Sequence, residues 1–408
     1  MRSERVGTHA VSTISAGSFG FEAKAGELHI PHIGEISLVT TLAGLEALAA
    51  PWRALARSAV RPAGLFQSYD WCAAWSRIYA APGSCNELCV LTGYDQGELV
   101  FVWPLMKTRL GPLRVLRWLS EPFAQYGDIL VSPATDAAAW LQAGVDFLKR
   151  LKDIDSIRLR HVRRDSLAYP YLAGKFQAAG EADGAPYLDL TPFPTEDAYE
   201  KRYSKEQRKR RRKIRKYLES KGTVTFEVLR AGSVMDRAMD QALAEKRKWL
   251  ASRGLYSRPI SCTAIENFLR ELSRAPGEEP AVVTSRLTAG GTPISWEIGL
   301  RYGDTHFGFI TAHDTALTDA SPARLHMDLS QRQAIKDGMK TFDLMVPADP
   351  HKESWSNGTV EVLDFHTPLS FQGWLYGFVY LQNLRPLIRR AYYSAAPRIR
   401  RYFVQASL

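Results

Sequence analysis

The chain has 408 residues, of which 45% are hydrophobic and 24% charged, and its formal net charge at pH 7 is +10. This composition is typical of a folded protein and excludes a disordered or fibrous chain. Because a single hydrophobic core rarely grows beyond about 250–300 residues, the length predicts two domains. The positive charge predicts an anionic partner, which could be nucleic acid, a membrane surface or a phosphate-rich cofactor.

The cysteines and the N-terminal segment narrow the class of protein further. Cys85 and Cys89 lie close together, but no second pair and no histidine cluster completes a zinc site, so we expect no metal. Residues 1–35 lack the apolar core of a signal peptide and are interpreted as a disordered leader. No run reaches the roughly 18 apolar residues that a transmembrane helix needs. We therefore expect a cytoplasmic protein.

The first half, residues 36–195, is predicted to form one α/β domain. Helices are indicated by apolar residues at helical spacing, such as Trp71 and Trp75, and strands by short apolar runs between turn residues. Strands are expected at 36–39, 88–92, 99–108, 113–119, 127–131 and 156–159. Helices are expected at 42–58, 68–79, 136–151 and 169–179.

A strongly basic segment then separates the halves. Residues 208–213 are all Lys or Arg, and a thin apolar stripe runs beside them at Tyr203, Ile214 and Leu218. We interpret residues 196–221 as a basic linker helix. Such a helix can be a solvated face, or it can contact anionic lipid, RNA or an anionic nucleotide regulator. No RNA-binding motif accompanies it, which disfavours nucleic acid without excluding it.

The second half, residues 222–365, repeats the order of the first: strand, two helices, an antiparallel meander of three strands, helix, strand. The similarity lies in the pattern of elements, not in the residues, and it indicates a duplication. The predicted elements are 223–228, 234–252, 264–273, 281–287, 292–302, 305–311, 322–336 and 341–345.

Residues 366–408 form an aromatic and basic helical tail. Trp374, Tyr376, Phe378 and Tyr380 alternate before a cluster of arginines. Aromatic side chains beside arginines are typical of a helix at a membrane interface. A helix docked on the second domain would give the same pattern. The first alternative favours peripheral attachment to the inner face of the cytoplasmic membrane.

The entry of the helix predicted at 322–336 could bind phosphate. Ser321 suits the N-cap, and Pro322 suits the first helical position because it lacks an amide hydrogen. The amides and the dipole at such a helix end favour a pyrophosphate. Ala323 is small enough to let a ligand approach, and Arg324 adds positive charge.

Several short motifs resemble the CelD-like (cellulose-biosynthesis type) acetyltransferase domain of the GNAT superfamily, a relative of the Fem-type peptidoglycan aminoacyltransferases. Together they span about residues 36–365. They are Leu65-Phe66-Gln67-Ser68 before Trp71 and Trp75, the basic helix Ser204–Leu218, Asp314, Ser321-Pro322, and Gly338 followed by Phe342-Asp343, Lys352 and Trp355.

The resemblance implies two tandem GNAT-like domains, each a mixed, mostly antiparallel sheet flanked by helices. It also implies an N-acyltransferase that transfers an acyl group from acyl-CoA, most simply acetyl-CoA, to an amine of a sugar or cell-envelope precursor. The donor would bind at Ser321, Pro322, Ala323 and Arg324. Ala323 departs from the family, which usually has Gly after Ser-Pro, and Gly adopts backbone angles that Ala does not.

Three carboxylates are candidates for acid–base work, because direct transfer needs a deprotonated amine and a stabilised oxyanion. Glu297 lies in an apolar strand, where burial would raise its pKa towards the working range of a base. Asp343 and Asp314 match the family pattern. Each of the three could instead be structural, as a salt-bridged or backbone-capping group.

The acceptor could be bound by Tyr126, Asp128 and Lys352, where Lys352 would pair with a phosphate or carboxylate. His313 and His351 are candidate acids, although a lone histidine is more often structural. No Gly-x-Ser-x-Gly elbow and no Walker or dinucleotide-binding motif occurs, which favours direct transfer. Two further hypotheses stay open: an aminoacyl-tRNA-dependent transferase, and an inactive regulatory or scaffold protein of polysaccharide synthesis.

Overall fold

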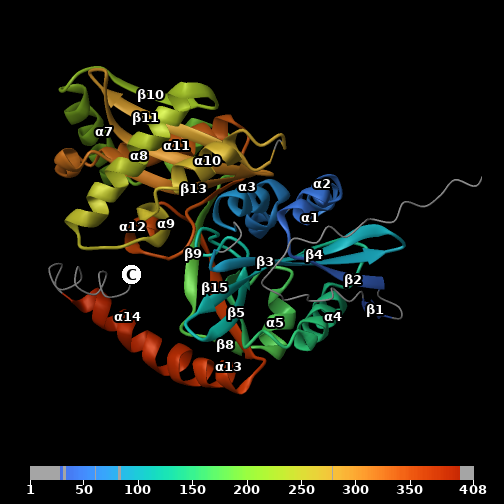
Figure 1. The fold of residues 1–408 in the computed structure, drawn as a ribbon. Coiled ribbons are helices and arrows are strands. Elements are labelled where there is room, and N and C mark those ends of the chain that lie inside the picture. The colour runs from blue at the N-terminus through green and yellow to red at the C-terminus, as the bar shows by residue number, and fades with distance from the viewer. Residues whose placement is uncertain (1–27, 31–33, 60, 81–83, 278, 396–408) are drawn as a thin grey trace, which may run out of the picture.

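The computed structural model describes residues 28–395 except for 31–33, 60, 81–83 and 278 (Figure 1). The fold is mixed α/β, with one large, mostly antiparallel sheet flanked by helices. Within the described part of the chain, every helix is too short or too polar to span a lipid bilayer.

The predicted elements appear in the expected order in both halves, whereas the strands β1, β8, β9 and β15 were not predicted. The strands are β1 (Leu28–Ile30), β2 (Gly34–Val39), β3 (Asn86–Asp95), β4 (Glu98–Leu110), β5 (Leu113–Trp118), β6 (Leu130–Val131), β7 (Ser156–Arg163), β8 (Gln177–Ala178), β9 (Asp183–Asp189), β10 (Val224–Leu229), β11 (Ala281–Ala289), β12 (Thr292–Tyr302), β13 (Thr305–His313), β14 (Thr341–Asp343) and β15 (Gly358–Pro368). The α-helices are α1 (Leu42–Ala47), α2 (Ala49–Ser58), α3 (Tyr69–Tyr79), α4 (Ala137–Arg150), α5 (Tyr169–Lys175), α6 (Glu196–Lys201), α7 (Lys205–Glu219), α8 (Gly232–Ser252), α9 (Arg258–Ser261), α10 (Ile265–Ser273), α11 (Pro322–Lys336), α12 (Pro350–Glu353), α13 (Phe371–Leu375) and α14 (Arg385–Ser394). Other helical segments are η1 (Pro62–Gln67), η2 (Thr315–Ala320) and η3 (Tyr376–Leu384).

The two halves are joined by an exchange of strands. The sheet runs β1-β2-β3-β4-β5-β7-β15-β9-β14-β13-β12-β11-β10. Each half forms an antiparallel meander that ends in one parallel pair, β5 with β7 and β13 with β14. Strand β15, from the end of the second half, then pairs with β7, and β9, from the end of the first half, pairs with β14. Because β9 and β15 also pair with each other, the repeated halves share one sheet.

The halves also share one hydrophobic core. In α10, Ile265, Phe268, Leu269 and Leu272 recur at helical spacing, and all four are buried. The ring of Phe268 packs edge-on against Trp71 of α3, in the first half, with ring centroids 4.9 Å apart. Both rings belong to a buried cluster that includes residues from strands of both halves. The two predicted domains are therefore not packed independently.

The basic helix α7 forms as expected, and it packs against the second half of the protein. The side chains of Ser204 and Gln207 make a reciprocal capping box, which satisfies two backbone amides at its start. Its apolar stripe buries Leu218 in a cluster with Leu325 of α11. The predicted linker helix, residues 196–221, is two helices: α7 packs on the second half, whereas Tyr199 of α6 is buried with Leu188 of β9 as well as with Phe342 of β14.

The C-terminal helices α13 and η3 pack on the first half, whereas α14 also reaches the second half, where the Tyr392 hydroxyl accepts a hydrogen bond from the amide of Tyr256 at 3.0 Å. Ser370 donates a hydrogen bond to Asp155, which precedes β7, at 2.7 Å. Tyr376 and Leu381 of η3 are buried with Val115 of β5. The series α13–η3–α14 runs along the lower edge of the molecule in Figure 1 (red).

Two predicted boundaries change. Strand pairing begins at Leu28, opposite Ile36, so the expected leader 1–35 is shorter than predicted. Of that leader, residues 1–27 and 31–33 lie outside the described residues, as does 396–408 of the tail. The domain boundary predicted at residue 365 falls inside β15, because this strand continues into the sheet of the first half.

Candidate functional site

The parallel strands β13 and β14 part to form a cavity. Their ladder covers only Thr305–Phe307 and Thr341–Asp343. Beyond these residues the strands diverge around a cavity of about 320 Å³, lined by Gly308–Thr311 on one side and Leu344–Pro347 on the other. Helices α8, α9, α10 and α12 and the segment between β5 and β6 supply further walls. The cavity thus has walls from both halves of the protein.

Two lysines line this cavity, and no described acidic side chain does. Lys246 projects from α8, and Lys352 from α12. Lys352 donates hydrogen bonds from Nζ to the backbone carbonyls of Met345 and Pro347, both at 2.9 Å. Burial, together with the nearby charge of Lys352, lowers the pKa of Lys246 to about 8. Burial also lowers the pKa of Lys352, although Asp349 opposes this.

Lys352 was singled out in the sequence, and Lys246 was missed. Lys246 stands in a charged stretch of α8 between Glu245 and Arg247, where nothing local distinguishes it. The spacing held a usable signal: Lys246 follows the buried Ala242 and Leu243 by four and three residues. These positions share one face of a helix, so Lys246 falls on the buried face.

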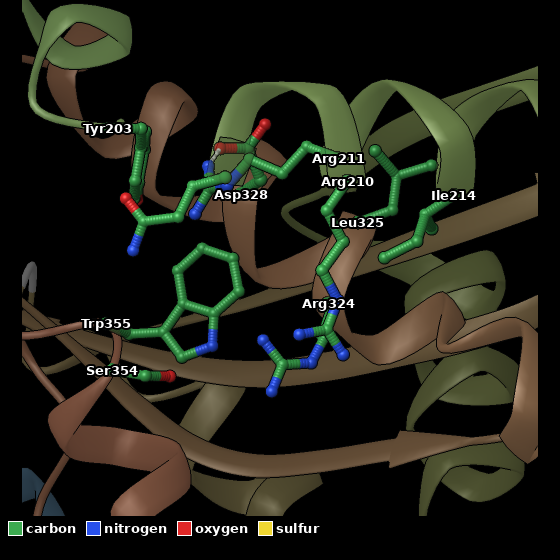
Figure 2. Close-up of a pocket in the computed structure, with 10 residues that line it drawn as sticks. Tyr203, Arg210, Arg211, Ile214, Arg324, Leu325, Asp328, Ser354 and Trp355 are labelled. Carbon is green, nitrogen blue, oxygen red and sulfur yellow. Dashed lines mark hydrogen bonds and ion pairs between the residues drawn. The ribbon is translucent and has the colours of Figure 1, made fainter. Parts of the chain in front are cut away.

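The start of α11 lies beside a second pocket, of about 230 Å³ (Figure 2). Arg324 lines it from α11, and Arg210 and Arg211 line it from α7. Figure 2 shows Arg210 extending from the basic helix towards Arg324. Burial, together with repulsion from Arg210 and Arg211, lowers the pKa of Arg324. The one carboxylate among the lining residues, Asp328, is paired with Arg211, so the pocket favours an anion.

The geometry of the helix entry differs from the prediction. Ser321 takes the N-cap position, but its backbone is left-handed (φ 53°) and its side chain caps no amide of α11. Pro322 is buried, and Ala323 follows it in the first turn. The first turn of α11 therefore receives no side-chain cap from Ser321.

Asp343 and Tyr126 are brought together, at the edge of the cavity. The Tyr126 hydroxyl donates to Asp343 Oδ1 at 2.7 Å, and Arg163 Nη1 donates to Asp343 Oδ2 at 2.8 Å. Asp343 Oδ1 also accepts the amide of Met345 at 2.7 Å. Met345 has a left-handed backbone (φ 59°), so Asp343 holds the strained turn that directs the chain away from β13. Burial, and the charge of Asp343, raise the pKa of Tyr126 well above its ordinary value.

Glu297 lies on the other face of the sheet. Glu297 Oε1 and His306 Nε2 are hydrogen-bonded at 2.7 Å, and His326 of α11 lies near Glu297. Its neighbour in β12, Ile298, points into the core cluster that α8 covers. The expected rise in pKa is wrong: burial alone would raise the pKa of Glu297, but the hydrogen bond and charge of His306 lower it. Glu297 is therefore not placed to take a proton in the cavity.

Two other predicted site residues hold the backbone. Asp128 is buried and accepts the amides of Ile129, Leu167 and Ala168 at 2.9–3.0 Å, which fixes the loop before α5. Burial raises the pKa of Asp128 to about 6 although these amides oppose it. It lines neither pocket described above. Asp314 caps the η2 turn by accepting the amide of Ala316 at 2.9 Å.

The two candidate histidines stand beside cationic groups. Burial lowers the pKa of His313, and Lys246 adds to this effect. Burial also lowers the pKa of His351, and Arg324 adds to it. Both rings are therefore neutral at pH 7. Within the described residues, no group of three or more His, Cys, Asp or Glu side chains could hold a metal ion.

Residues 204–353 match the family described as an acetyltransferase (GNAT) domain. The match begins at the N-cap of α7, so the basic helix lies within the matched range. A search of the curated proteins finds no match to this chain.

Two solved structures share the fold. FemX superimposes with a TM-score of 0.58 at 13% identity, over 81% of this chain and 98% of FemX. The C-terminal domain of a putative lysylphosphatidylglycerol synthetase from Agrobacterium fabrum superimposes with a TM-score of 0.50 at 11% identity, over 80% of this chain and 93% of that domain. At these identities the likeness concerns the fold alone. Residues 204–353 are thus similar to a GNAT acetyltransferase domain, within a fold that 81% of the chain shares with FemX.

Proposed function

We propose that this acyltransferase is an acyl-CoA-dependent N-acyltransferase that acetylates an amino group of a sugar or cell-envelope precursor by direct transfer. The observation that carries the proposal is the arrangement around the parted strands. The cavity between β13 and β14 holds two lysines, and the start of α11 lies beside three guanidinium groups. A long donor with phosphates at one end and a thioester at the other fits these two features.

The phosphates of the donor fit the pocket of Arg210, Arg211 and Arg324. Guanidinium groups bind phosphate oxygens in pairs of parallel hydrogen bonds, and the amides of the first turn of α11 add further donors. The equivalent helix start in the first half is unsuited to phosphate, because the Asp136 carboxylate caps α4 by accepting the amide of Ala138 at 2.9 Å. One donor site, in the second half, follows from this difference.

The lysines support the chemistry of transfer. The amine nitrogen attacks the thioester carbonyl carbon, the C–S bond breaks, and the proton released by the nitrogen passes through Lys246 to the leaving thiolate. With a pKa of about 8, Lys246 is partly uncharged near neutral pH and can accept that proton. An ammonium group has three N–H donors. Lys352 uses two of them on carbonyls, and the third supports the developing oxyanion.

The acceptor class rests on the resemblance to CelD-like acetyltransferases and on the charge of the cavity. Two lysines without a described carboxylate favour an acceptor that carries a phosphate or a carboxylate near its amine. Tyr126 and Asp128, which were predicted to bind the acceptor, do not line this cavity, whereas Lys352 does. Of the predicted acceptor-binding residues, Lys352 remains the candidate.

The donor is tested by calorimetry with acetyl-CoA. We expect micromolar binding by the wild type and a loss of at least about tenfold in Arg324→Glu, since a charge-assisted contact is replaced by repulsion. Arg212→Glu is the matched control, because Arg212 is exposed on the same basic helix as Arg210 and lines neither pocket. No binding by the wild type at millimolar acetyl-CoA would reject acetyl-CoA as the donor.

A second candidate donor is aminoacyl-tRNA. The observation that favours it is the fold shared with FemX, together with the row of exposed Lys and Arg residues on α7. The sequence motifs resemble a domain that is related to the Fem-type aminoacyltransferases. Transfer from a cell extract that is abolished by ribonuclease, with no response to added acetyl-CoA, would favour this donor over acyl-CoA.

We further propose that the protein attaches peripherally to the inner face of the cytoplasmic membrane through its C-terminal helices. Among the described residues, nine of the thirteen large hydrophobic side chains that are exposed lie between residues 371 and 388. Such a concentration of exposed apolar side chains marks an interaction surface. An acceptor that belongs to the cell envelope would be reached from that position.

A further inference from the structure

The first half of the sheet buries a positively charged face under the C-terminal helices. Side chains alternate between the two faces of a strand. On β5 and β7 this alternation places Arg117, Arg158 and Arg160 on the face that α13 and η3 cover, while Leu116 and Ile157 point into the core on the other side. Only 7% of Arg117 and 8% of Arg158 is exposed.

The positive charge of this face exceeds its negative charge. Arg117 and Arg160 pair with Glu121, and Arg160, Arg158 and Arg385 lie within 3.2–4.0 Å of Asp364. Four guanidinium groups therefore share two carboxylates. Burial opposes the ionisation of Glu121, but Arg117 and the other arginines hold its pKa at about 2, so it stays charged.

Two of these arginines have unused donors. Arg117 Nε and Arg158 Nε are buried and have no hydrogen-bond partner among the described residues. The neighbouring His366 adds no further positive charge, because burial lowers its pKa to about 4 and keeps the ring neutral. Buried charges are normally paired, and buried donors are normally hydrogen-bonded. Within the described part of the chain, the cluster therefore has unused guanidinium donors and one unused carboxylate oxygen, Glu121 Oε2, and its excess of positive charge favours a further anion.

A cavity of about 700 Å³ opens directly onto Arg117 and Arg158. Its other walls are mostly apolar. Leu110 and Leu113 come from the β4–β5 hairpin, and Leu375, Tyr376 and Val379 come from the C-terminal helices. A ligand that fills it must combine an anionic group with an apolar chain. The volume is far more than a lone phosphate occupies.

The rim of this cavity continues into the exposed apolar surface of the C-terminal helices. Phe371 is 76% exposed, and Trp374 and Phe378 are 48% and 53% exposed. The rings of Trp374 and Phe378 stack with centroids 5.5 Å apart. Leu387, 61% exposed, and Arg390 extend the same surface along α14. An apolar surface with flanking arginines suits the boundary between headgroups and acyl chains.

We propose that this cavity binds the phosphate headgroup of an anionic membrane phospholipid, with Arg117 and Arg158 contacting the phosphate. The lipid chain passes between Leu113 and Leu375 to the apolar surface outside. This inference deepens the proposed membrane attachment, and it is independent of the acyl donor. It assigns headgroup selectivity to the buried arginines and non-selective insertion to the exposed aromatic residues.

The test is flotation with phosphatidylcholine vesicles that contain or lack phosphatidylglycerol. The wild type should prefer the anionic vesicles. Arg158→Gln should weaken that binding by about tenfold or more, because it removes a buried charge-assisted contact. The control Arg164→Gln removes the same charge from a side chain that is 66% exposed, so its effect should stay within the about fivefold expected of a surface charge.

Further variants separate the headgroup site from attachment and from folding. Val379→Glu alters a side chain that is 45% exposed, so the fold should persist, and it places a carboxylate at the cavity wall. It should abolish the preference for anionic vesicles. Phe371→Ser with Trp374→Ser should instead reduce binding to both kinds of vesicle.

Two results would overturn the proposal. The first is equal loss of binding in Arg158→Gln and Arg164→Gln with Val379→Glu unaffected, which would show ordinary surface attraction and leave membrane attachment itself intact. The second is thermal stabilisation of the protein by glycerol 1-phosphate as strong as that by short-chain phosphatidylglycerol, which would indicate a soluble phosphate ligand. Acetyl-CoA titration of each variant reports separately on the donor site.

Discussion

The hydroxyl of Tyr126 donates a 2.7 Å hydrogen bond to Asp343, 217 residues away, and this bond ties the first half of the protein to the wall of the cavity. Tyr126 lies in the segment after β5, and Asp343 is the last residue of β14, where the parallel pairing with β13 ends. Arg163 joins both residues: its guanidinium binds Asp343 and lies 4.8 Å from the ring centroid of Tyr126. The position of the turn at Met345 thus depends on residues from both halves.

Tyr126→Phe tests this link. The substitution leaves one lone pair of a buried carboxylate without its donor, so the free energy of unfolding should fall by about 1–3 kcal/mol. Urea unfolding measures the loss. The control Tyr217→Phe removes a hydroxyl from a ring that is 48% exposed and should change stability by less than about 0.5 kcal/mol. Equal effects of the two substitutions would show that the Tyr126 hydroxyl stabilises nothing.

The role of Lys246 predicts the pH dependence of transfer. If Lys246 accepts the proton of the amine, kcat should rise with pH as its ammonium group deprotonates around pH 8. Lys246→Gln should lower kcat by about 10²–10⁴-fold and remove that limb of the profile. Lys248→Gln, two positions along the same helix, lines no cavity described here and should keep both. A limb near pH 8 that persists in Lys246→Gln would contradict the assignment.

The same lysine predicts how stability varies with pH. The pKa of Lys246 in the folded protein, about 8, lies below its ordinary value of 10.5. Between these values the unfolded chain holds a proton that the folded protein has lost, so the free energy of unfolding rises with pH. Below pH 8 the fold bears the full cost of the buried ammonium group. Lys246→Met should therefore stabilise the protein at pH 7 by about 1–3 kcal/mol, and this gain should vanish above pH 10.5 in denaturant titrations at each pH.

Local signals in the sequence predicted local structure well. The Lys and Arg run with its apolar stripe indicated the helix that forms at α7, and the structure adds a capping box of Ser204 and Gln207 at its start. The order of strands and helices in both halves followed from periodicity in the same way. The exchange of β9 and β15 could not be predicted, since the pairing of strands so far apart in the chain leaves no local pattern.

The candidate site was predicted less completely, because its residues are defined by which face of an element they occupy. Glu297 and Ile298 are neighbours in β12, and only the packing of the helices shows that Ile298 lies in the core cluster that α8 covers while Glu297 lies near α11. Asp128 reads as a polar residue at a strand start, and only the folded loop shows that three amides surround it. Lys352 was identified through a sequence motif. Lys246 could have been identified only from its position on the buried face of α8.

The two helix starts predict a contrast that separates a structural cap from a ligand site. In the first half, Asp136 caps α4 through its side chain, so Asp136→Ala should lower the free energy of unfolding by about 0.5–2 kcal/mol. In the second half, the Ser321 side chain caps nothing, so Ser321→Ala should cost less than about 0.5 kcal/mol.

Acetyl-CoA should stabilise each protein in which the phosphate pocket is intact. Because an anion at the start of α11 would supply the missing acceptor, a saturating ligand at about 100 times its Kd should raise stability by about 2.7 kcal/mol in the wild type, Asp136→Ala and Ser321→Ala alike. The rise should be absent in Arg324→Glu, which lacks a guanidinium group of the phosphate pocket. Thermal unfolding with and without ligand measures all four proteins. A rise in Arg324→Glu as large as in the wild type would place the donor away from α11, and a ligand effect lost in Asp136→Ala alone would place it in the first half.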